Sequence, residues 1–245
     1  MRPPLPAELI DYIFSFLRGD IPALNACFGS HPSISQLAER YLFADVVFGE
    51  LDSLMLYKKL SKKFSKNPRI LQYIRTLKFF NTTSVYSELP VLLSMIPQMV
   101  NLVSVTLCEI QRNNPVNTSI LRVCLQQPSV KRVLLSRFRR FPLSLLDKGK
   151  YIKKLTLLDC QPISEPKSKS PQQLPEELSI RGSLDIYLLT WLTDRVANLK
   201  SLHLEMEKEH WTSFPDLLSA CSRTLTELHL SVSTNVWQYS SHYAS

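Results

Sequence analysis

The chain has 245 residues, of which 44% are hydrophobic, 20% are charged and only 5 are glycine, and its formal net charge at pH 7 is +8. This length allows one sizeable core, or a small module followed by an extended array. Neither a membrane-spanning helix nor a secretory signal is expected, because no apolar run reaches about 18 residues and prolines and acids occupy the first positions.

The common catalytic and cofactor motifs are absent from the sequence. It contains no GxSxG, HExxH, GxxxxGK[ST] or GxGxxG, so the usual frameworks for a nucleophile, a zinc ion or a phosphate have no local signature. The five cysteines are scattered without CxxC spacing, which favours reduced thiols in the cytoplasm or nucleus. We therefore expect no enzyme activity, no cofactor and no metal site.

The positive charge is concentrated in the middle of the chain. Residues 51–160 contain 19 basic and 5 acidic side chains, whereas residues 1–50 and 161–245 are each slightly acidic. Such a block can bind nucleic acid or an acidic protein, or it can be an ordinary solvated surface. Its densest parts are Lys58, Lys59, Lys62, Lys63 and Lys66, followed by Arg137, Arg139, Arg140, Lys148, Lys150, Lys153 and Lys154.

The first 48 residues predict three short helices. An apolar stripe at helical spacing follows Pro6, which suits a first helical turn, and Gly19 fits a left-handed stop after the helix. Asp20 begins a second helix that runs to about Phe28, and a Ser33/Gln36 capping box predicts the start of a third. Three helices in about 40 residues are too small to be stable alone, so we expect them to need a partner surface or the following residues.

This N-terminal run resembles the opening of the F-box family, in a divergent form that lacks the usual tryptophan. The positions that match the family pattern are Leu5, Pro6, Glu8, Leu9, Ile13, Leu17 and Leu24. The resemblance implies docking on the Skp-family adaptor of a cullin–RING ubiquitin ligase. The adaptor-binding residues that it implies are Leu5, Pro6, Leu9, Ile10, Ile13, Leu17 and Leu24.

Seven segments of alternating apolar residues recur every 22 to 28 residues through the rest of the chain. They are RTLKFF from Arg75, SVTLCE from Ser104, RVLLSR from Arg132, KLTLLD from Lys154, ELSIRG from Glu177, SLHLEM from Ser201 and ELHLSV from Glu227. A period in this range is typical of a solenoid, in which only stacked neighbours bury the apolar face of each strand.

Helical segments are expected between these strands, at 51–64, 85–99, 118–126, 184–196 and 211–221, with a loop in place of a helix at 161–175. The alternation predicts an α/β fold with parallel strands in an open horseshoe. Only Cys160 occupies the position at which leucine-rich repeats place an Asn or Cys, so an irregular solenoid is expected. A short F-box followed by irregular leucine-rich repeats is similar to the layout of many fungal F-box proteins.

The outward face of such a sheet is the expected substrate-binding surface, because alternate residues point away from the core. The residues proposed for this concave face are Lys78, Thr106, Arg132, Leu134, Lys154, Thr156, Ser179, His203 and His229. The two histidines occupy equivalent positions and should lie about 5 Å apart, one strand spacing, as surface residues rather than metal ligands.

The sequence thus predicts an F-box-like helical module over residues 1–48 and an irregular leucine-rich-repeat solenoid of about seven strand units over 49–245. The expected function is that of a substrate-receptor subunit of an SCF-type ubiquitin ligase, with a substrate protein on the repeats and neither nucleic acid nor membrane as a partner. The alternative is a repeat scaffold that binds acidic protein or nucleic acid through its basic middle segment. The last strand signature is followed by about a dozen residues, so the solenoid either continues in a longer protein or is capped by a tail that contains Trp237, Tyr239 and Tyr243.

Overall fold

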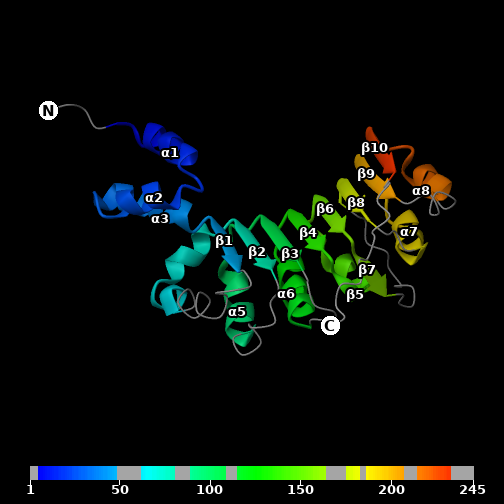
Figure 1. Ribbon diagram of the computed structural model, residues 1–245, viewed down its shortest axis with the longest axis horizontal. Helices are drawn as coiled ribbons and strands as arrows, with labels where there is room; N and C mark the ends of the chain where they lie inside the picture. Colours follow the sequence, from blue (N-terminus) through cyan, green and yellow to red (C-terminus); the bar gives the residue numbers. More distant parts are fainter. Residues whose placement is uncertain are drawn as a thin grey trace, which may run out of the picture.

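The fold centres on one parallel sheet of eight strands, seen as an arc in Figure 1. The computed structural model describes residues 5–48, 62–80, 89–108, 115–163, 175–182, 186–206 and 214–232. The sheet is open, and its order is β1-β2-β3-β4-β6-β8-β9-β10. Its strands are β1 (Asp45–Phe48), β2 (Thr76–Phe80), β3 (Ser104–Cys108), β4 (Arg132–Ser136), β6 (Lys154–Leu158), β8 (Glu177–Arg181), β9 (Ser201–Met206) and β10 (Glu227–Val232).

All seven predicted strands are present, and each pairs in parallel with its neighbours in chain order. Six of them begin at the predicted residue, and β2 begins one residue after Arg75. The backbone carbonyl that precedes one strand accepts two N–H groups from the next, as Lys131 O does from Lys153 N at 2.8 Å and Lys154 N at 2.9 Å. These hydrogen bonds at the start of the strands align each strand with the one before it.

Alternate side chains of β1 to β4, β6, β8 and β9 point into the main core. The first inward position of each main-sheet strand from β2 to β9 is aligned with that of its neighbours and is at most 2% exposed. These residues are Leu77, Val105, Val133, Leu155, Leu178 and Leu202. The hydrophobic alternation therefore sets both the strand and the face that it buries.

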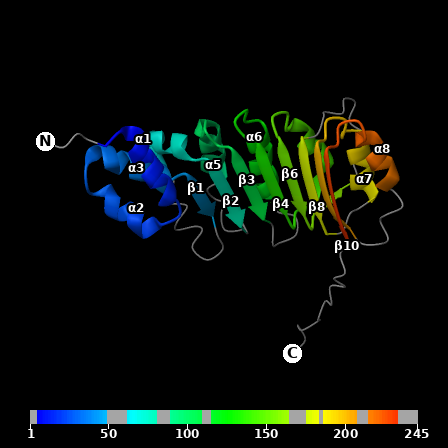
Figure 2. The same cartoon turned by 90° about the horizontal axis from the view of Figure 1, so that it is seen from above.

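Helices cover the core side of the sheet and leave its other face open (Figures 1 and 2). They are α5 (Leu89–Met95), η3 (Ile96–Gln98), α6 (Pro115–Leu125), η4 (Leu143–Lys148), α7 (Ile186–Thr193) and α8 (Phe214–Cys221), with η1 (Pro68–Tyr73) ahead of β2. Four of the five predicted helical segments thus contain a helix, with ends shifted by a few residues. Of the fifth, 51–64, residues 62–64 are helical in a helix that runs to 66, and the others lie outside the described residues.

A second, two-stranded parallel sheet was not predicted. It pairs β5 (Arg139–Pro142) with β7 (Gln161–Ile163) beyond the ends of β4 and β6. The chain turns into it through Arg137 and Asp159, whose φ angles are 55° and 51°. The buried Cys160 Sγ donates to the carbonyl of Leu135 in β4 at 3.4 Å, so this thiol bonds the backbone of the neighbouring strand.

The N-terminal helices are α1 (Ala7–Phe16), α2 (Ile21–Phe28) and α3 (Pro32–Leu42). Gly19 has a φ of +92°, and Asp20 caps α2 by accepting from Ala23 N at 3.0 Å, as expected. The capping box predicted at Ser33 and Gln36 is wrong. Because the proline of α3 occupies the first turn, His31 is the cap, and its Nδ1 accepts from Ser33 N at 3.3 Å.

The helical part ends earlier than predicted. Residues Asp45–Phe48, placed in the N-terminal module by the sequence, form β1 and pair with β2 along their whole length. Phe48 stacks on Phe79 of β2 with ring centroids 4.9 Å apart. The sheet therefore begins directly after α3, and the helices and the sheet are joined without a linker.

Among the described residues, no helix is long and apolar enough to cross a membrane. The five cysteines lie within the described residues and form no disulfide. Cys124 is fully buried, and this burial raises the pKa of its thiol to about 12. A thiol with so high a pKa stays protonated near pH 7.

Candidate interaction surfaces

One side of helix α1 packs into a small hydrophobic core that the three N-terminal helices share. Phe14 is 4% exposed, and it packs with the fully buried Leu24 of α2 and Ala38 of α3. Ile10 and Leu17 lie half-buried against the same cluster. This small core is separate from the main core beneath the sheet.

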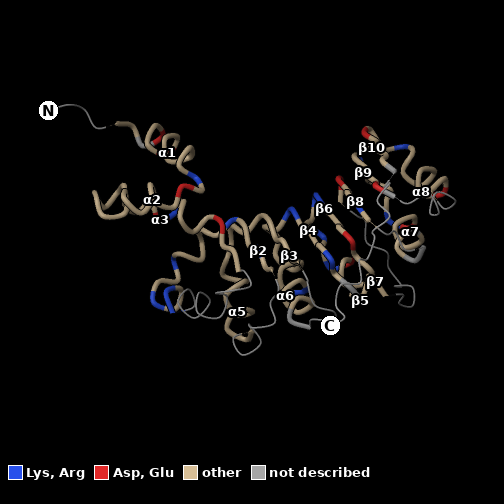
Figure 3. Tube along the Cα trace, in the orientation of Figure 1, with Lys and Arg blue, Asp and Glu red and all other residues tan. Residues whose placement is uncertain are grey.

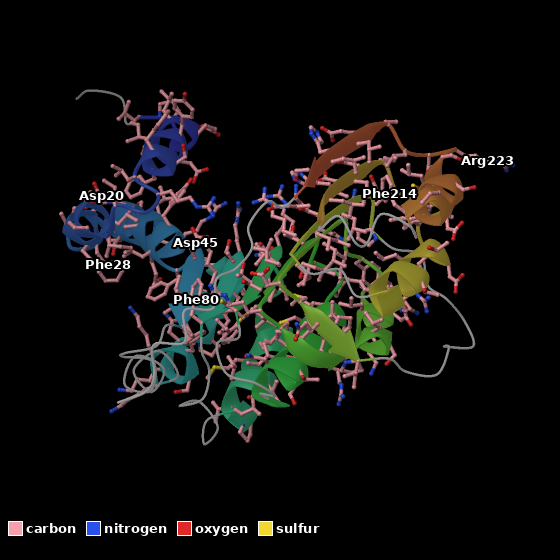
Figure 4. All side chains as sticks on the ribbon, turned by 45° about the vertical axis from the view of Figure 1, so that its right-hand side comes forward. Asp20, Phe28, Asp45, Phe80, Phe214 and Arg223 are labelled. Carbon is pink, nitrogen blue, oxygen red and sulfur yellow. The ribbon has the colours of Figure 1, made fainter. Side chains whose placement is uncertain are left out.

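The opposite side of α1 exposes large apolar side chains. We call it the α1 apolar face, and its residues are Leu5, Leu9, Tyr12, Ile13 and Phe16, which are 60%, 48%, 62%, 50% and 71% exposed. Of the fifteen exposed large hydrophobic residues in the described part of the chain, seven lie between positions 5 and 28. Figures 1 and 4 show α1 standing apart from the sheet at the end where β1 lies.

The predicted adaptor-binding residues divide between the two sides of α1. Leu5, Pro6, Leu9 and Ile13 are exposed, and Ile10 and Leu17 pack into the small core. Leu24 is fully buried, so it supports the helices from within and does not lie on a binding surface.

Sequence reasoning missed two exposed aromatic residues of this face. The rings of Tyr12 and Phe16 lie edge to face with centroids 4.8 Å apart. Both positions fall outside the apolar stripe predicted for this helix, which combined residues of its buried and exposed sides. Two large aromatic residues four positions apart, beyond that stripe, were the signal that could have identified them.

The orientation of α1 is held by a polar contact with α3. The hydroxyl of Tyr41 donates to the backbone oxygen and the Oδ1 of Asp11, both at 3.1 Å. Burial and this hydrogen bond together raise the pKa of Tyr41 above its ordinary value. Arg40 approaches the Oδ1 of Asp11 to 3.7 Å from the same helix as Tyr41.

A bidentate ion pair joins the helical end to the sheet. Arg18 donates to both carboxylate oxygens of Asp45 at 2.9 and 3.0 Å. Burial raises the pKa of Asp45, but hydrogen bonds from Arg18 and Thr76 outweigh it and bring the pKa below its ordinary value. Lys63 lies over the ring of Phe43 at 4.3 Å, a second contact at this junction.

The uncovered face of the sheet carries a continuous column of aligned side chains. The pairing registers connect the central outward residues in one row across all eight strands, as predicted, with Val47 of β1 added at its start. In order they are Val47, Lys78, Thr106, Leu134, Thr156, Ser179, His203 and His229. None of them is buried.

Ion pairs cross between neighbouring strands on the same face. Lys154 donates to Glu177 at 2.8 Å, and Arg181 lies 3.6 Å from Glu205. Arg132, the other predicted residue in the column of Lys154, is exposed. An exposed pair of this kind contributes about 0 to 1 kcal/mol to the free energy of unfolding. These pairs therefore stabilise the fold little, and they matter mainly for the charge pattern of the face.

The two predicted histidines do stand side by side. The rings of His203 and His229 are stacked, with centroids 5.6 Å apart and an interplanar angle of 24°. Glu227 lies 2.9 Å from the Nε2 of His229, and this hydrogen bond lowers the pKa of Glu227. The described residues contain no group of three or more side chains arranged to hold a metal ion.

The basic middle segment separates into two groups in space (Figure 3). Lys62, Lys63 and Lys66 lie exposed near the N-terminal helices, and Lys58 and Lys59 lie outside the described residues. Lys153 and Lys154 lie at β6, where both approach glutamates. These two dense basic stretches therefore lie at different places along the molecule.

Comparison with known protein families and with curated proteins gives no relative for this chain. It matches no protein-family model and no curated protein.

Proposed function

We propose that this chain is a substrate-receptor subunit of an SCF-type ubiquitin ligase. In this proposal α1 to α3 are an F-box-like module that docks on the Skp-family adaptor. The open sheet is an irregular leucine-rich-repeat solenoid whose outward face holds a substrate protein. No chemical step is assigned to the chain itself.

The α1 apolar face is the observation that carries the proposal. Large apolar side chains gathered on one exposed surface of a protein mark an interaction site. Here they lie on a small helical unit with its own core, and Leu5, Leu9 and Ile13 of this face are positions that match the F-box pattern. A partner that covered this face would bury five large side chains, of which the two aromatic ones are the residue type most often found at binding hot spots.

The sheet supports the second half of the proposal. Its strands follow chain order, each pairs only with its neighbours, and their inward residues form one continuous core. These are the properties of an array of stacked repeats. Such an array presents a long, uncovered face, which suits recognition of another macromolecule better than catalysis.

The junction between the two parts gives a receptor mechanism. The ion pair between Arg18 and Asp45 joins the N-terminal helices to the first strand of the sheet. The contact of Lys63 with the ring of Phe43 adds a second connection next to it. A substrate bound on the sheet is then held at a defined distance from the adaptor. The receptor acts by raising the effective concentration of the substrate near the ligase.

Capture by an immobilised Skp-family adaptor tests the adaptor half of the proposal. We expect the wild-type chain to be retained and Ile13→Asp to be lost by tenfold or more, because a carboxylate would have to be buried at the centre of the face. Circular dichroism checks that the variant is folded, since Ile13 is 50% exposed and outside the small core.

Val100→Asp is the matched control. Val100 is 58% exposed and lies outside the helical end, so the same change of charge there should leave retention unaltered. Equal retention of Ile13→Asp and Val100→Asp, or no retention of the wild-type chain, would overturn the adaptor-binding role.

A further inference from the structure

The outward face of the sheet has an uneven distribution of charge. Strands β2 to β6 place the cations of Lys78, Arg132 and Lys154 on it, and none of the described outward residues of these strands is acidic. Acids flank these strands on both sides: Asp45 lies on β1, and Glu177, Glu205 and Glu227 follow on β8, β9 and β10. We call the outward surface of β2, β3, β4 and β6 the basic sector.

Two of these cations are open to a ligand. Arg132 is exposed and forms no ion pair among the described residues. Lys78 forms no ion pair among the described residues, and the nearby Asp45 carboxylate already accepts from Arg18 at both oxygens. Lys154, in contrast, is engaged by Glu177.

The spacing of the two open cations suits an extended peptide. Lys78 and Arg132 lie two strands apart and in adjacent columns, which places their Cα atoms about 12 Å from each other. An extended chain covers this distance in three or four residues. Between and beside them lie Thr106, which offers a hydroxyl, and the half-buried Leu134, which offers an apolar contact.

We propose that the basic sector binds an extended acidic segment of a substrate protein, with acids three or four residues apart and an apolar residue close to one of them. This inference rests on the proposed receptor function and names the class of segment that the sheet would hold. Charge complementarity with Lys78 and Arg132 supplies the specificity.

The same surface is poorly suited to a nucleic acid. Proteins that bind single strands stack the bases on aromatic side chains along a basic groove. Phe80, at the end of β2, is the single aromatic residue among the described outward residues of the basic sector. Two open cations would also neutralise few phosphates, whereas strong binding to nucleic acid needs many such contacts.

Fluorescence anisotropy with the full chain and a labelled peptide tests the inference. The probe is a peptide of about ten residues, made of Glu and Ser with one central Leu. We expect the double variant Lys78→Thr/Arg132→Ser to weaken binding about tenfold, which corresponds to about 1.4 kcal/mol. Raising the salt concentration severalfold should weaken wild-type binding too, because exposed charges are screened.

Lys62→Ser/Lys66→Thr is the matched control, because it removes the same charge from exposed positions outside the sheet. Equal losses in the two double variants would overturn the inference, since net charge alone would then explain the binding. So would equal binding of a peptide with Gln in place of Glu. Tighter binding of an oligothymidine of the same length would replace it with the nucleic-acid interpretation.

The outcome is separable from that of the adaptor experiment. Lys78 and Arg132 do not lie on the α1 apolar face, so the sheet variant should be captured by the adaptor like the wild-type chain. Failure of the peptide to bind while adaptor capture persists overturns the acidic-segment inference alone. Failure of adaptor capture while the peptide binds overturns the ligase role and leaves the basic sector as a peptide-binding surface.

Discussion

At the scale of single residues, the left-handed turns beyond the strands show which positions need glycine. Gly182 follows β8 with a φ of +97°, at the place that Arg137 and Asp159 occupy after β4 and β6. Those two residues show that the φ angle alone is tolerated. At position 182, however, a Cβ would meet the Oδ1 of Asp159 and lie 3.1 Å from its Cα. The requirement for glycine therefore comes from backbone angle and close approach together.

We predict that Gly182→Ala lowers the free energy of unfolding by about 2 kcal/mol, measured by urea denaturation. A left-handed alanine costs about 1 kcal/mol, and the displaced Asp159 carboxylate adds to it. The backbone of residue 159 cannot withdraw easily, because its N–H donates to Arg181 O at 2.8 Å.

Two other glycines separate these contributions. Gly19 also has a positive φ of +92°, but no atom lies within 4 Å of the place that an added methyl group would take, so Gly19→Ala should cost only the backbone contribution of about 1 kcal/mol. Gly29 has a φ of −94° and equally open surroundings, so Gly29→Ala should be nearly neutral. Equal costs for Gly182→Ala and Gly19→Ala would show that the contact with Asp159 contributes nothing.

At the scale of elements, an ion pair links two segments on the core side of the sheet. Arg195, just beyond α7, donates to both oxygens of Asp147 in η4 at 2.9 and 3.3 Å. The two side chains are only 5% and 12% exposed. The guanidinium also lies 4.6 Å from the centre of the Trp191 ring and donates to its backbone oxygen at 3.1 Å. This contact connects the return segments on either side of residues 161–175.

We expect Arg195→Met to lower the free energy of unfolding by about 3 kcal/mol, because it leaves the Asp147 carboxylate largely buried without its partner. The double variant Arg195→Met/Asp147→Leu should recover most of this loss, since a buried pair can be replaced by apolar side chains at little cost. Thermal and urea unfolding of the two variants measure the difference.

The control for this pair is Lys154→Met, which breaks an ion pair with Glu177 whose side chains are about half exposed. Its effect should stay below about 1 kcal/mol. A double variant no more stable than Arg195→Met would show that the loss comes from packing around Trp191 rather than from the unpaired charge.

Strands were predicted more accurately than helices because of what each pattern specifies. The alternation of apolar and polar residues along a strand determines, for each residue, whether its side chain points into the core. The seven segments all repeat this alternation. Helix ends depend on caps and tertiary contacts, so α6 begins three residues before Thr118 and α7 ends before Val196. The strands β5 and β7 were missed because Pro142 and Pro162 lie within them, and proline lowers the expectation of a strand.

The candidate surfaces were predictable in different degrees. The outward column of the sheet follows from register, and the structure aligns every predicted member. The two sides of α1 could not be told apart, since both are apolar and only packing decides that Phe14 is 4% exposed while Phe16 is 71% exposed. The β1 strand was missed because DVVF is four residues long and follows a helix directly.

At the scale of the whole molecule, the two ends of the sheet differ. At the β1 end the inward residues Val46 and Phe48 are 5% and 2% exposed, and α3 precedes the strand. At the β10 end Leu228 and Leu230 are each 41% exposed, although their partners on β9, Leu202 and Leu204, are fully buried. Within the described residues the sheet is therefore covered at its first strand and open at its last, and Trp237, Tyr239 and Tyr243 of the predicted cap lie outside them.

This asymmetry predicts a gradient of mutational cost along the molecule. Leu202→Ala should lower the free energy of unfolding by about 3 kcal/mol, the usual cost of truncating a buried leucine. Leu228→Ala should cost half of that or less, because much of its side chain already contacts solvent. Urea denaturation of the two variants under the same conditions measures the ratio.

Hydrogen exchange gives an independent measurement of the same gradient. Backbone amides of β10 should exchange faster than those of β3 and β4, which have a paired strand on both sides. Equal costs for Leu202→Ala and Leu228→Ala, together with equal protection of β10 and β4, would contradict an open end at β10.

The order of strands along the sheet has a consequence for how such a molecule can change its size. Since each strand of the eight-stranded sheet pairs only with the strands before and after it in that sheet, a duplicated segment can be inserted between two neighbours outside the stretch from β4 to β8, which also carries the β5–β7 pair, without rearranging any other pairing. Each insertion would carry the outward side chains beyond it about 4.8 Å farther from the helical end. The reach of the molecule is thus adjustable in discrete steps by gene duplication.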